Sequence, residues 1–142
     1  MGRTTERIGR QGEFYACGFL AGLSDTVTLI PHGSEADILF DYDNHIYKCQ
    51  VKTKSKPKKG SVNWKFDLRR GSHTKNRHYQ EGQIDIYALY CKPYEKIYFI
   101  PFDGNLTCIT ISDKDMKEVK SEETLINSLD QLKTKDQQGT RN

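Results

Sequence analysis

The sequence predicts an α/β (α+β) fold in which a mixed central β-sheet is flanked by helices. Apolar residues recur at helical spacing near the N-terminus and alternate with polar residues through the middle of the chain, and a Ser-Glu-Glu helix start stands near the C-terminus. The 142 residues suit one domain, which we expect over residues 1–136, with a frayed tail over 137–142.

Composition and motifs exclude several classes of protein. No apolar stretch approaches the roughly 20 residues of a membrane span, and the Arg-rich N-terminus leads into no signal-peptide core. The four cysteines form no C-x-x-C pair, which favours buried, reduced thiols over a zinc or redox motif. No P-loop, Rossmann fingerprint or G-x-S-x-G motif is present. We therefore expect a cytoplasmic, intracellular protein with no membrane partner.

The first elements are a helix and a short strand. The spacing of Ile8, Phe14, Cys17, Phe19 and Leu20 predicts a helix over 6–23. Gly22, Ser24 and Asp25 then end it. The β-branched run 26–30 predicts a strand, which a proline and a glycine stop.

A β-hairpin follows over 35–52, with Asp43-Asn44 as its two-residue turn. In this register paired positions sum to 87, so Asp37 lies opposite Gln50 with β-carbons roughly 5 Å apart. Lys52 points to the same face because side chains alternate along a strand. An acid, an amide and an ammonium group are thus predicted on one patch of sheet.

The other face of the hairpin supports this register. It would carry the apolar side chains of Ile38, Phe40, Tyr42, Tyr47, Cys49 and Val51. Two alternatives stay open: an ordinary half-exposed sheet whose charges have no function, and a longer turn that shifts the register by one residue.

Four further strands and a helix complete the expected fold. Strands are predicted over 62–68, 84–91, 95–100 and 106–111. In the first of these, Val62, Trp64, Phe66 and Leu68 share one face. Ser121 is expected to cap a helix that runs to about Lys133, with two glutamates in its first turn.

Charge is distributed unevenly along the chain. Between Lys48 and His78 there are eleven Lys or Arg and one acid, a local charge of +10, whereas the rest of the chain carries −7. Such a basic segment is typical of a surface that binds a polyanion. The alternative is a solvated loop, against which stand the adjoining hairpin site and the two aromatic residues inside the segment.

Together these motifs resemble the PD-(D/E)XK nuclease superfamily, which has a restriction-endonuclease-like core. Within it, the chain looks like the group I intron-associated homing endonucleases and, beyond them, the Holliday-junction resolvases. The resemblance spans roughly 3–101. It rests on Gly12-Glu13, Asp37, Gln50-Val51-Lys52, Ile84-Asp85-Ile86-Tyr87 and Ile97-Tyr98-Phe99-Ile100-Pro101.

The resemblance implies a role for each residue of the predicted site. Asp37 matches the metal-binding aspartate, Lys52 the lysine that acts on the attacking water, and Glu13 an acid on the first helix. Ala36 stands where a proline is common, and Gln50 replaces the second acid. Glu13, Asp37 and Gln50 would hold Mg²⁺, for which Mn²⁺ can substitute. Glu13 as a surface residue and Gln50 as the mark of an inactive nuclease remain alternatives.

The function implied is metal-dependent hydrolysis of phosphodiester bonds in double-stranded DNA by a site-specific homing endonuclease. The alternatives are a structure-specific resolvase and an inactive DNA-binding module. A homo-oligomer, dimer or tetramer, is expected because two strands need two active sites. Trp64 either belongs to the core or lies on a strand that reads bases. The residues expected to bind DNA are Lys54, Lys56, Lys58, Lys59, Lys65, Arg69, Arg70, Lys75 and Arg77.

Overall fold

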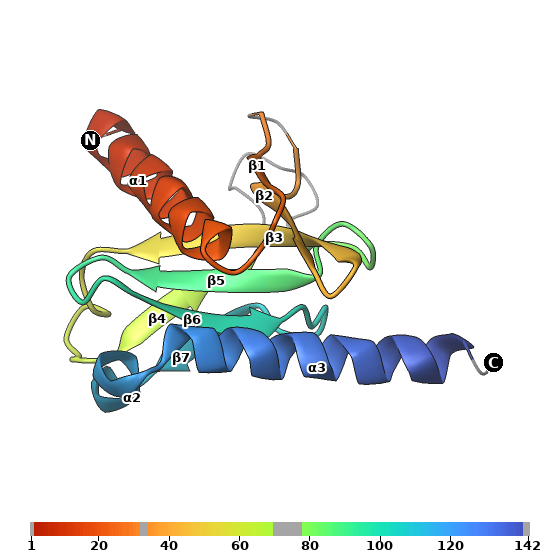
Figure 1. Ribbon diagram of the computed structural model, residues 1–142. Helices are drawn as coiled ribbons and strands as arrows, with labels where there is room; N and C mark the ends of the chain where they lie inside the picture. The colour runs from red at the N-terminus through yellow and green to blue at the C-terminus, as the bar shows by residue number, and fades with distance from the viewer. Residues whose placement is uncertain (1, 32–33, 70–77, 141–142) are drawn as a thin grey trace.

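The computed structural model describes residues 2–31, 34–69 and 78–140, and side chains as far as residue 135 (Figure 1). Seven strands and three helices lie in this part of the chain. In order they are α1 (Gly2–Ala21), β1 (Val27–Leu29), β2 (Ile38–Tyr42), β3 (His45–Lys54), β4 (Trp64–Asp67), β5 (Ile86–Cys91), β6 (Lys96–Pro101), β7 (Cys108–Ile111), α2 (Asp113–Glu118) and α3 (Ser121–Thr140).

The central sheet has five strands in the order β1-β2-β3-β5-β6. Strands β3 and β5 are parallel, and the other neighbours are antiparallel. A second sheet pairs β4 with β7. The predicted mixed sheet flanked by helices is therefore confirmed.

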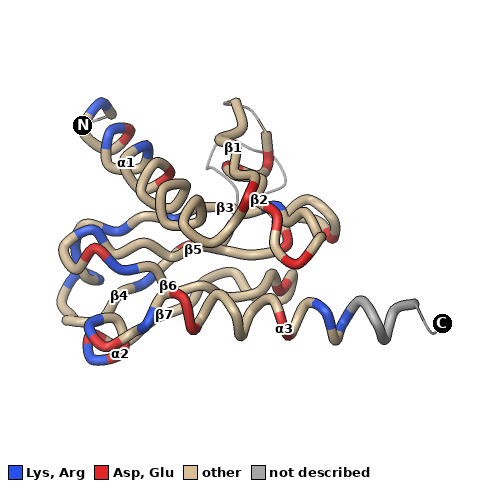
Figure 2. The backbone as a smooth tube through the Cα atoms, viewed as in Figure 1, with Lys and Arg blue, Asp and Glu red and all other residues tan. Residues whose placement is uncertain are grey.

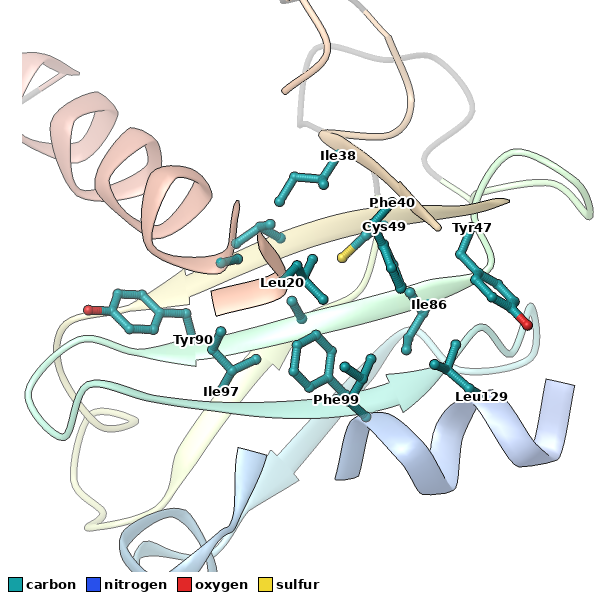
Figure 3. Close-up of a cluster of buried hydrophobic side chains, with 14 residues drawn as sticks. Leu20, Ile38, Phe40, Tyr47, Cys49, Ile86, Tyr90, Ile97, Phe99 and Leu129 are labelled. Carbon is teal, nitrogen blue, oxygen red and sulfur yellow. The ribbon is translucent and has the colours of Figure 1, made fainter. Parts of the chain in front are cut away.

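Each face of the central sheet is covered by its own core. On one face, Ala16 and Leu20 of α1 and Leu129 of α3 pack against strand side chains that include Ile38 and Phe99 (Figure 3). On the other face, β4, β7 and α2 cover alternate residues of β5 and β6. Strand β5 is buried at all six positions because helices lie on one side and the small sheet on the other.

The predicted hairpin register is correct. Tyr42 pairs with His45 and Ile38 with Cys49. Both turn residues are left-handed, with φ of 52° at Asp43 and 66° at Asn44. Two consecutive positive φ angles are typical of the tight turn whose twist matches the flanking strands. Asp and Asn tolerate this conformation better than most residues do.

The structure moves several predicted boundaries. Helix α1 begins at Gly2 and ends at Ala21, earlier at both ends than expected. Helix α3 continues to Thr140, through residues 137–140 that we expected to be frayed. Ser121 does not act as the predicted cap, since it lies inside the helix. Its hydroxyl accepts a hydrogen bond of 2.9 Å from the amide of Ile97, which ties α3 to β6.

The structure also differs from the predictions for Val62, for one short helix and for two cysteines. Val62 is exposed, since β4 begins only at Trp64. Helix α2 was not predicted, because six residues give too short a pattern to recognise. Of the four cysteines expected to be buried, Cys17 is half-buried and Cys108 is exposed. Cys49 is buried, and burial, with a smaller effect of the Asp37 charge, raises the pKa of its thiol.

Candidate active site

The site lies beside the first residue of β2, where β3 extends past its pairing with β2. The β2–β3 pairing ends at Ile38 and Cys49, but β3 runs on to Lys54. Asp37 spans this junction. Its amide donates to Cys49 O at 2.9 Å, and its Oδ2 accepts from the Val51 amide at 2.9 Å. The carboxylate therefore takes the place of a strand partner and is held at the open edge of the sheet.

Helix α1 brings a second acid to this edge. Gly12 is buried against β3, where an added Cβ would lie 1.9 Å from Thr53 Oγ1 and 3.2 Å from the Tyr90 ring. Real Cβ atoms do not approach other atoms so closely, so the helix can lie here only because residue 12 has no side chain. The next residue, Glu13, is consequently placed beside the strand that carries Gln50.

The four predicted catalytic residues line one cleft. Glu13 comes from α1, Asp37 from the start of the hairpin, and Gln50 and Lys52 from β3. The cleft has a volume of about 450 Å³, and its other lining residues come from α1, from β3 and from the loop that follows β3. The hairpin register predicted three of these neighbours, and the helix supplies the fourth.

Gln50 lines this cleft and has an unsatisfied side-chain oxygen. Its Oε1 is buried and has no hydrogen-bond partner among the described residues. Buried polar atoms nearly always have a partner, so an orphaned carbonyl oxygen beside two carboxylates fits a site for a hard cation. No group of three His, Cys, Asp or Glu side chains suited to a metal occurs in the described part of the chain. The candidate set is two carboxylates and one amide oxygen.

Lys52 is held at the wall of the cleft by groups from another layer of the fold. Its Nζ donates to Arg69 O at 2.7 Å and lies 5.6 Å from the centroid of the Tyr79 ring. Its side chain is half-buried. The Arg69 carbonyl and the Tyr79 ring therefore hold the ammonium group of this lining residue.

The residues expected to bind DNA occupy different positions. Lys54 and Lys56 line the cleft, and Lys58 and Lys59 are exposed on the loop that follows β3. Lys65 is exposed on the outer face of β4. Arg70, Lys75 and Arg77 lie outside the described residues.

Arg69 is not simply available to a ligand. Its Nε and Oδ1 of Asp67 lie 3.0 Å apart, and this hydrogen-bonded pair raises the pKa of the guanidinium. The pair is exposed, so a phosphate could compete with Asp67 at little cost.

Trp64 belongs to the core, which decides between the two alternatives for this residue. Its side chain is 3% exposed, and its Nε1 donates to Asp113 Oδ1 at 3.0 Å. Lys65 and Asp67 alternate with the buried residues on the outer face of β4.

Part of the cleft wall was not predicted from the sequence. Thr5, Ile8 and Gly9 of α1 line it beside Glu13, and their spacing of three and four residues places them on one face of the helix. The same half of α1 carries the exposed Arg3, Arg7 and Arg10. The helical periodicity carried this signal, but only the resemblance, through Glu13, placed this helix beside the hairpin.

This hairpin in a mixed sheet carries an acid and a lysine, and the first helix adds a further acid. The arrangement agrees with the resemblance to PD-(D/E)XK nucleases, except that Gln50 replaces the second acid. A sequence model described as "PD-(D/E)XK endonuclease" matches residues 4–128. The chain therefore belongs to the PD-(D/E)XK endonuclease family, and the nuclease class predicted from the sequence is confirmed.

A solved structure has the same fold. It is described as "The structure of a bacterial homing endonuclease: I-Ssp6803I" and aligns with a TM-score of 0.63 at 22% identity. The alignment covers 84% of this chain and 86% of that one. The predicted resemblance to homing endonucleases is thus confirmed at the level of the fold.

A comparison with curated protein sequences gave no match. Among the described helices, none is both long and apolar enough to cross a membrane.

Proposed function

We propose that this protein is a metal-dependent endonuclease that hydrolyses phosphodiester bonds in double-stranded DNA at a specific site, as a homing enzyme does. The observation that carries the proposal is the cleft, which Glu13, Asp37, Gln50 and Lys52 line together. Within the described part of the chain, the Gln50 oxygen lacks a hydrogen-bond partner. The similar fold of a protein described as a homing endonuclease supports the choice of substrate.

Glu13, Asp37 and the amide oxygen of Gln50 would hold the ion, with Mg²⁺ as the expected species and Mn²⁺ as a substitute. A divalent ion bound there supplies an activated water and offsets the charge of the phosphate. Asp37 is fixed for this role by its bond to the Val51 amide. Lys52 contributes a cation beside the scissile phosphate, where negative charge grows as the water attacks.

DNA binding falls to the basic residues around the cleft. Lys54 and Lys56 stand at its wall, and Lys58 and Lys59 extend the same surface. Contacts of these ammonium groups with phosphates would supply affinity independent of sequence. Base recognition would come from elsewhere, and the outer face of β4, with Lys65, is available for it.

Asp37→Asn and Lys52→Ala test the site. Each variant should reduce Mg²⁺-dependent nicking of supercoiled DNA by at least about 100-fold. Asp37→Asn removes a negative charge that would hold the metal ion, and Lys52→Ala removes the ammonium group beside the phosphate. Asparagine keeps an oxygen that can accept from the Val51 amide, so folding should persist. Mn²⁺ in place of Mg²⁺ should support nicking by the wild-type protein.

The hairpin offers a matched control for each variant. Asp41 Oδ1 accepts from the Thr26 amide, and Lys48 Nζ donates to Gly82 O, yet neither residue lines the cleft. Asp41→Asn and Lys48→Ala should therefore cut at the wild-type rate. Near-normal cutting by either site variant contradicts the assignment of that residue.

The substrate distinguishes this function from its two alternatives. Cleavage of one duplex sequence supports a homing enzyme, and cleavage of four-way junctions regardless of sequence supports a resolvase. Binding of DNA without cleavage in any metal supports an inactive module. We further propose a dimer or a tetramer, since cutting two strands needs two sites. Light scattering of the protein with and without DNA measures this.

A further inference from the structure

An aromatic residue from outside the cleft contacts its lysine. The Nζ of Lys52 lies over the Tyr79 ring, 5.6 Å from the centroid, while it donates to Arg69 O. We propose that Tyr79 is a positioning residue, whose ring face directs the Lys52 ammonium toward the scissile phosphate. The proposal rests on the proposed function, in which Lys52 acts on the reacting phosphate.

Tyr79 is itself held in place by packing. Its side chain is 8% exposed, and its ring meets the Tyr87 ring edge to face, with centroids 6.3 Å apart and an interplanar angle of 68°. Such a geometry is favourable for two aromatic rings. The Tyr79 ring is therefore a fixed surface for the lysine.

Tyr87 connects this surface to the rest of the site. It is 1% exposed, and its hydroxyl donates to Leu68 O at 3.0 Å. On the sheet it pairs with Gln50 across β3 and β5. The consecutive carbonyls of Leu68 and Arg69 thus bind Tyr87 and Lys52. The two tyrosine rings and these two carbonyls therefore hold the ammonium group beside the strand pair that carries Gln50.

These contacts matter because the side chain of a lysine is long and flexible. An ammonium on a four-carbon stem samples many rotamers unless contacts select one. The negative face of an aromatic ring attracts a cation, and a carbonyl accepts one of its protons. A cation fixed before the substrate arrives stabilises the transition state without reorganising. Phenylalanine would preserve this effect, since the ring face and not the hydroxyl provides it.

The first test does not depend on catalysis. Protons that lie over an aromatic ring resonate upfield, so two lysines should have displaced Hε–Cε signals in wild type. One signal is that of Lys117, which lies over Tyr94, and the other is that of Lys52. Its loss in Lys52→Arg identifies it. The displacement should persist in Tyr79→Phe and vanish in Tyr79→Leu. A signal that stays in place in Tyr79→Leu would overturn the proposal.

The second test separates positioning from binding. In single-turnover cleavage of bound DNA, Tyr79→Leu should be slower by about tenfold, the range expected for one cation–ring contact. The Kd for DNA should be unchanged, and Tyr79→Phe should cut at close to the wild-type rate. Equal losses in both variants, or a loss confined to Kd, would contradict a role for the ring face.

A matched control guards against a general loss of stability. Tyr94 makes the same kind of contact, with Lys117 Nζ 5.7 Å from its ring centroid, and neither residue lines the cleft. Tyr94→Leu should therefore cut normally at temperatures where it is folded. If wild type fails to cut any DNA, the proposed function fails, and the displacement of the Lys52 signal still decides whether Tyr79 positions the lysine.

Discussion

The absence of a side chain at Gly12 determines how closely α1 approaches β3. Glycine inside a helix is less favourable than alanine by about 1 kcal/mol. It persists here because the Thr53 hydroxyl occupies the place of a Cβ, 1.9 Å away. Since Glu13 follows directly, the contact that admits the helix also brings the acid to the cleft.

Gly12→Ala should lower both the free energy of unfolding and the rate of cleavage. The added methyl group must push α1 away from β3, and this costs about 1–3 kcal/mol, as overpacking commonly does. Urea unfolding and the nicking assay measure the two effects. Thr53→Ala in the same chain removes the closest atom, so it should restore part of both losses.

Gly18 provides the control on the same helix. It is exposed, and among the described residues no atom beyond its neighbours in the chain and the nearby helix backbone lies within 4 Å of an added Cβ. Gly18→Ala should therefore stabilise the protein by about 1 kcal/mol through helix propensity. A Gly12→Ala variant that behaves like Gly18→Ala would show that the close approach is unimportant.

Gln50 raises a question of charge at the residue scale. A glutamine offers an oxygen but no charge, so the proposed metal site has two carboxylates, Glu13 and Asp37. Glu13→Gln should therefore reduce cleavage severely, by about 100-fold or more, because one carboxylate remains. Gln50→Glu alone should keep metal-dependent cutting. In the double variant the charge returns, and part of the activity should return with it.

A Mg²⁺ titration of cleavage for the four proteins measures this exchange. The double variant should need less Mg²⁺ than Glu13→Gln alone. Indifference to Glu13→Gln would remove Glu13 from the proposed site. No recovery in the double variant would mean that position, and not charge alone, decides the role of each oxygen.

At the scale of elements, Asp113 joins α2 to the second sheet. Its Oδ1 accepts from Tyr94 OH at 2.6 Å and from Trp64 Nε1 at 3.0 Å. Lys117 Nζ lies 3.1 Å from its Oδ2. The hydrogen bond from Tyr94, followed by the one from Trp64, lowers the pKa of the Asp113 carboxyl to about 2. A six-residue helix that tertiary contacts anchor needs no strong signal of its own.

The lowered pKa of Asp113 predicts how stability depends on pH. In the unfolded chain the carboxyl has a pKa of about 3.9 and binds its proton first. Its contribution to folding is therefore complete above about pH 4 and is lost as the pH falls toward 2. Asp113→Asn should lower the free energy of unfolding at pH 7, and the difference from wild type should shrink between pH 4 and 2.

Asp115→Asn is the control, because that carboxylate is exposed on the same helix and makes none of these contacts. Urea unfolding at a series of pH values gives all three curves. A difference between Asp113→Asn and wild type that stays constant down to pH 2 would contradict the assigned role of the carboxylate.

Across the whole molecule, basic residues gather on two segments that also contribute to the cleft. Figure 2 shows Lys and Arg along the first half of α1 and on the loop that follows β3. Lys54 and Lys56 line the cleft, and α1 carries the exposed Arg3, Arg7 and Arg10 beside its own lining residues. Positive charge on both segments favours the approach of a polyanion.

Lys58→Ala with Lys59→Ala tests this surface. The double variant should bind DNA more weakly, and the slope of log K against log salt should fall by up to about two units, roughly one per lost phosphate contact. Lys133→Ala with Lys135→Ala removes the same charge at the far end of α3, where these residues pair with Asp43 and Glu81. That control should leave the slope unchanged. An unchanged slope in the first variant would place the loop away from DNA.

Local pattern determined the hairpin and the residues that it carries. Asp43 and Asn44 tolerate positive φ, and alternation then fixes which face Asp37, Gln50 and Lys52 share. These relations involve residues close in sequence, so the order of residues is enough to predict them. Sequence patterns also predicted the family and the mixed sheet. For Trp64 they left two alternatives, of which burial in the core is the correct one.

Only the tertiary structure decided how distant segments meet. Three features depend on packing between elements far apart in the chain. They are the close approach of Gly12 to Thr53, the contacts of Lys52 with Arg69 O and the Tyr79 ring, and the exposure of Val62. Periodicity gives the face of a helix but not its neighbour. The sequence by itself thus determined which chemical groups lie on the hairpin. Packing between distant segments determined how closely α1 brings Glu13 to them and that the Tyr79 ring lies against Lys52.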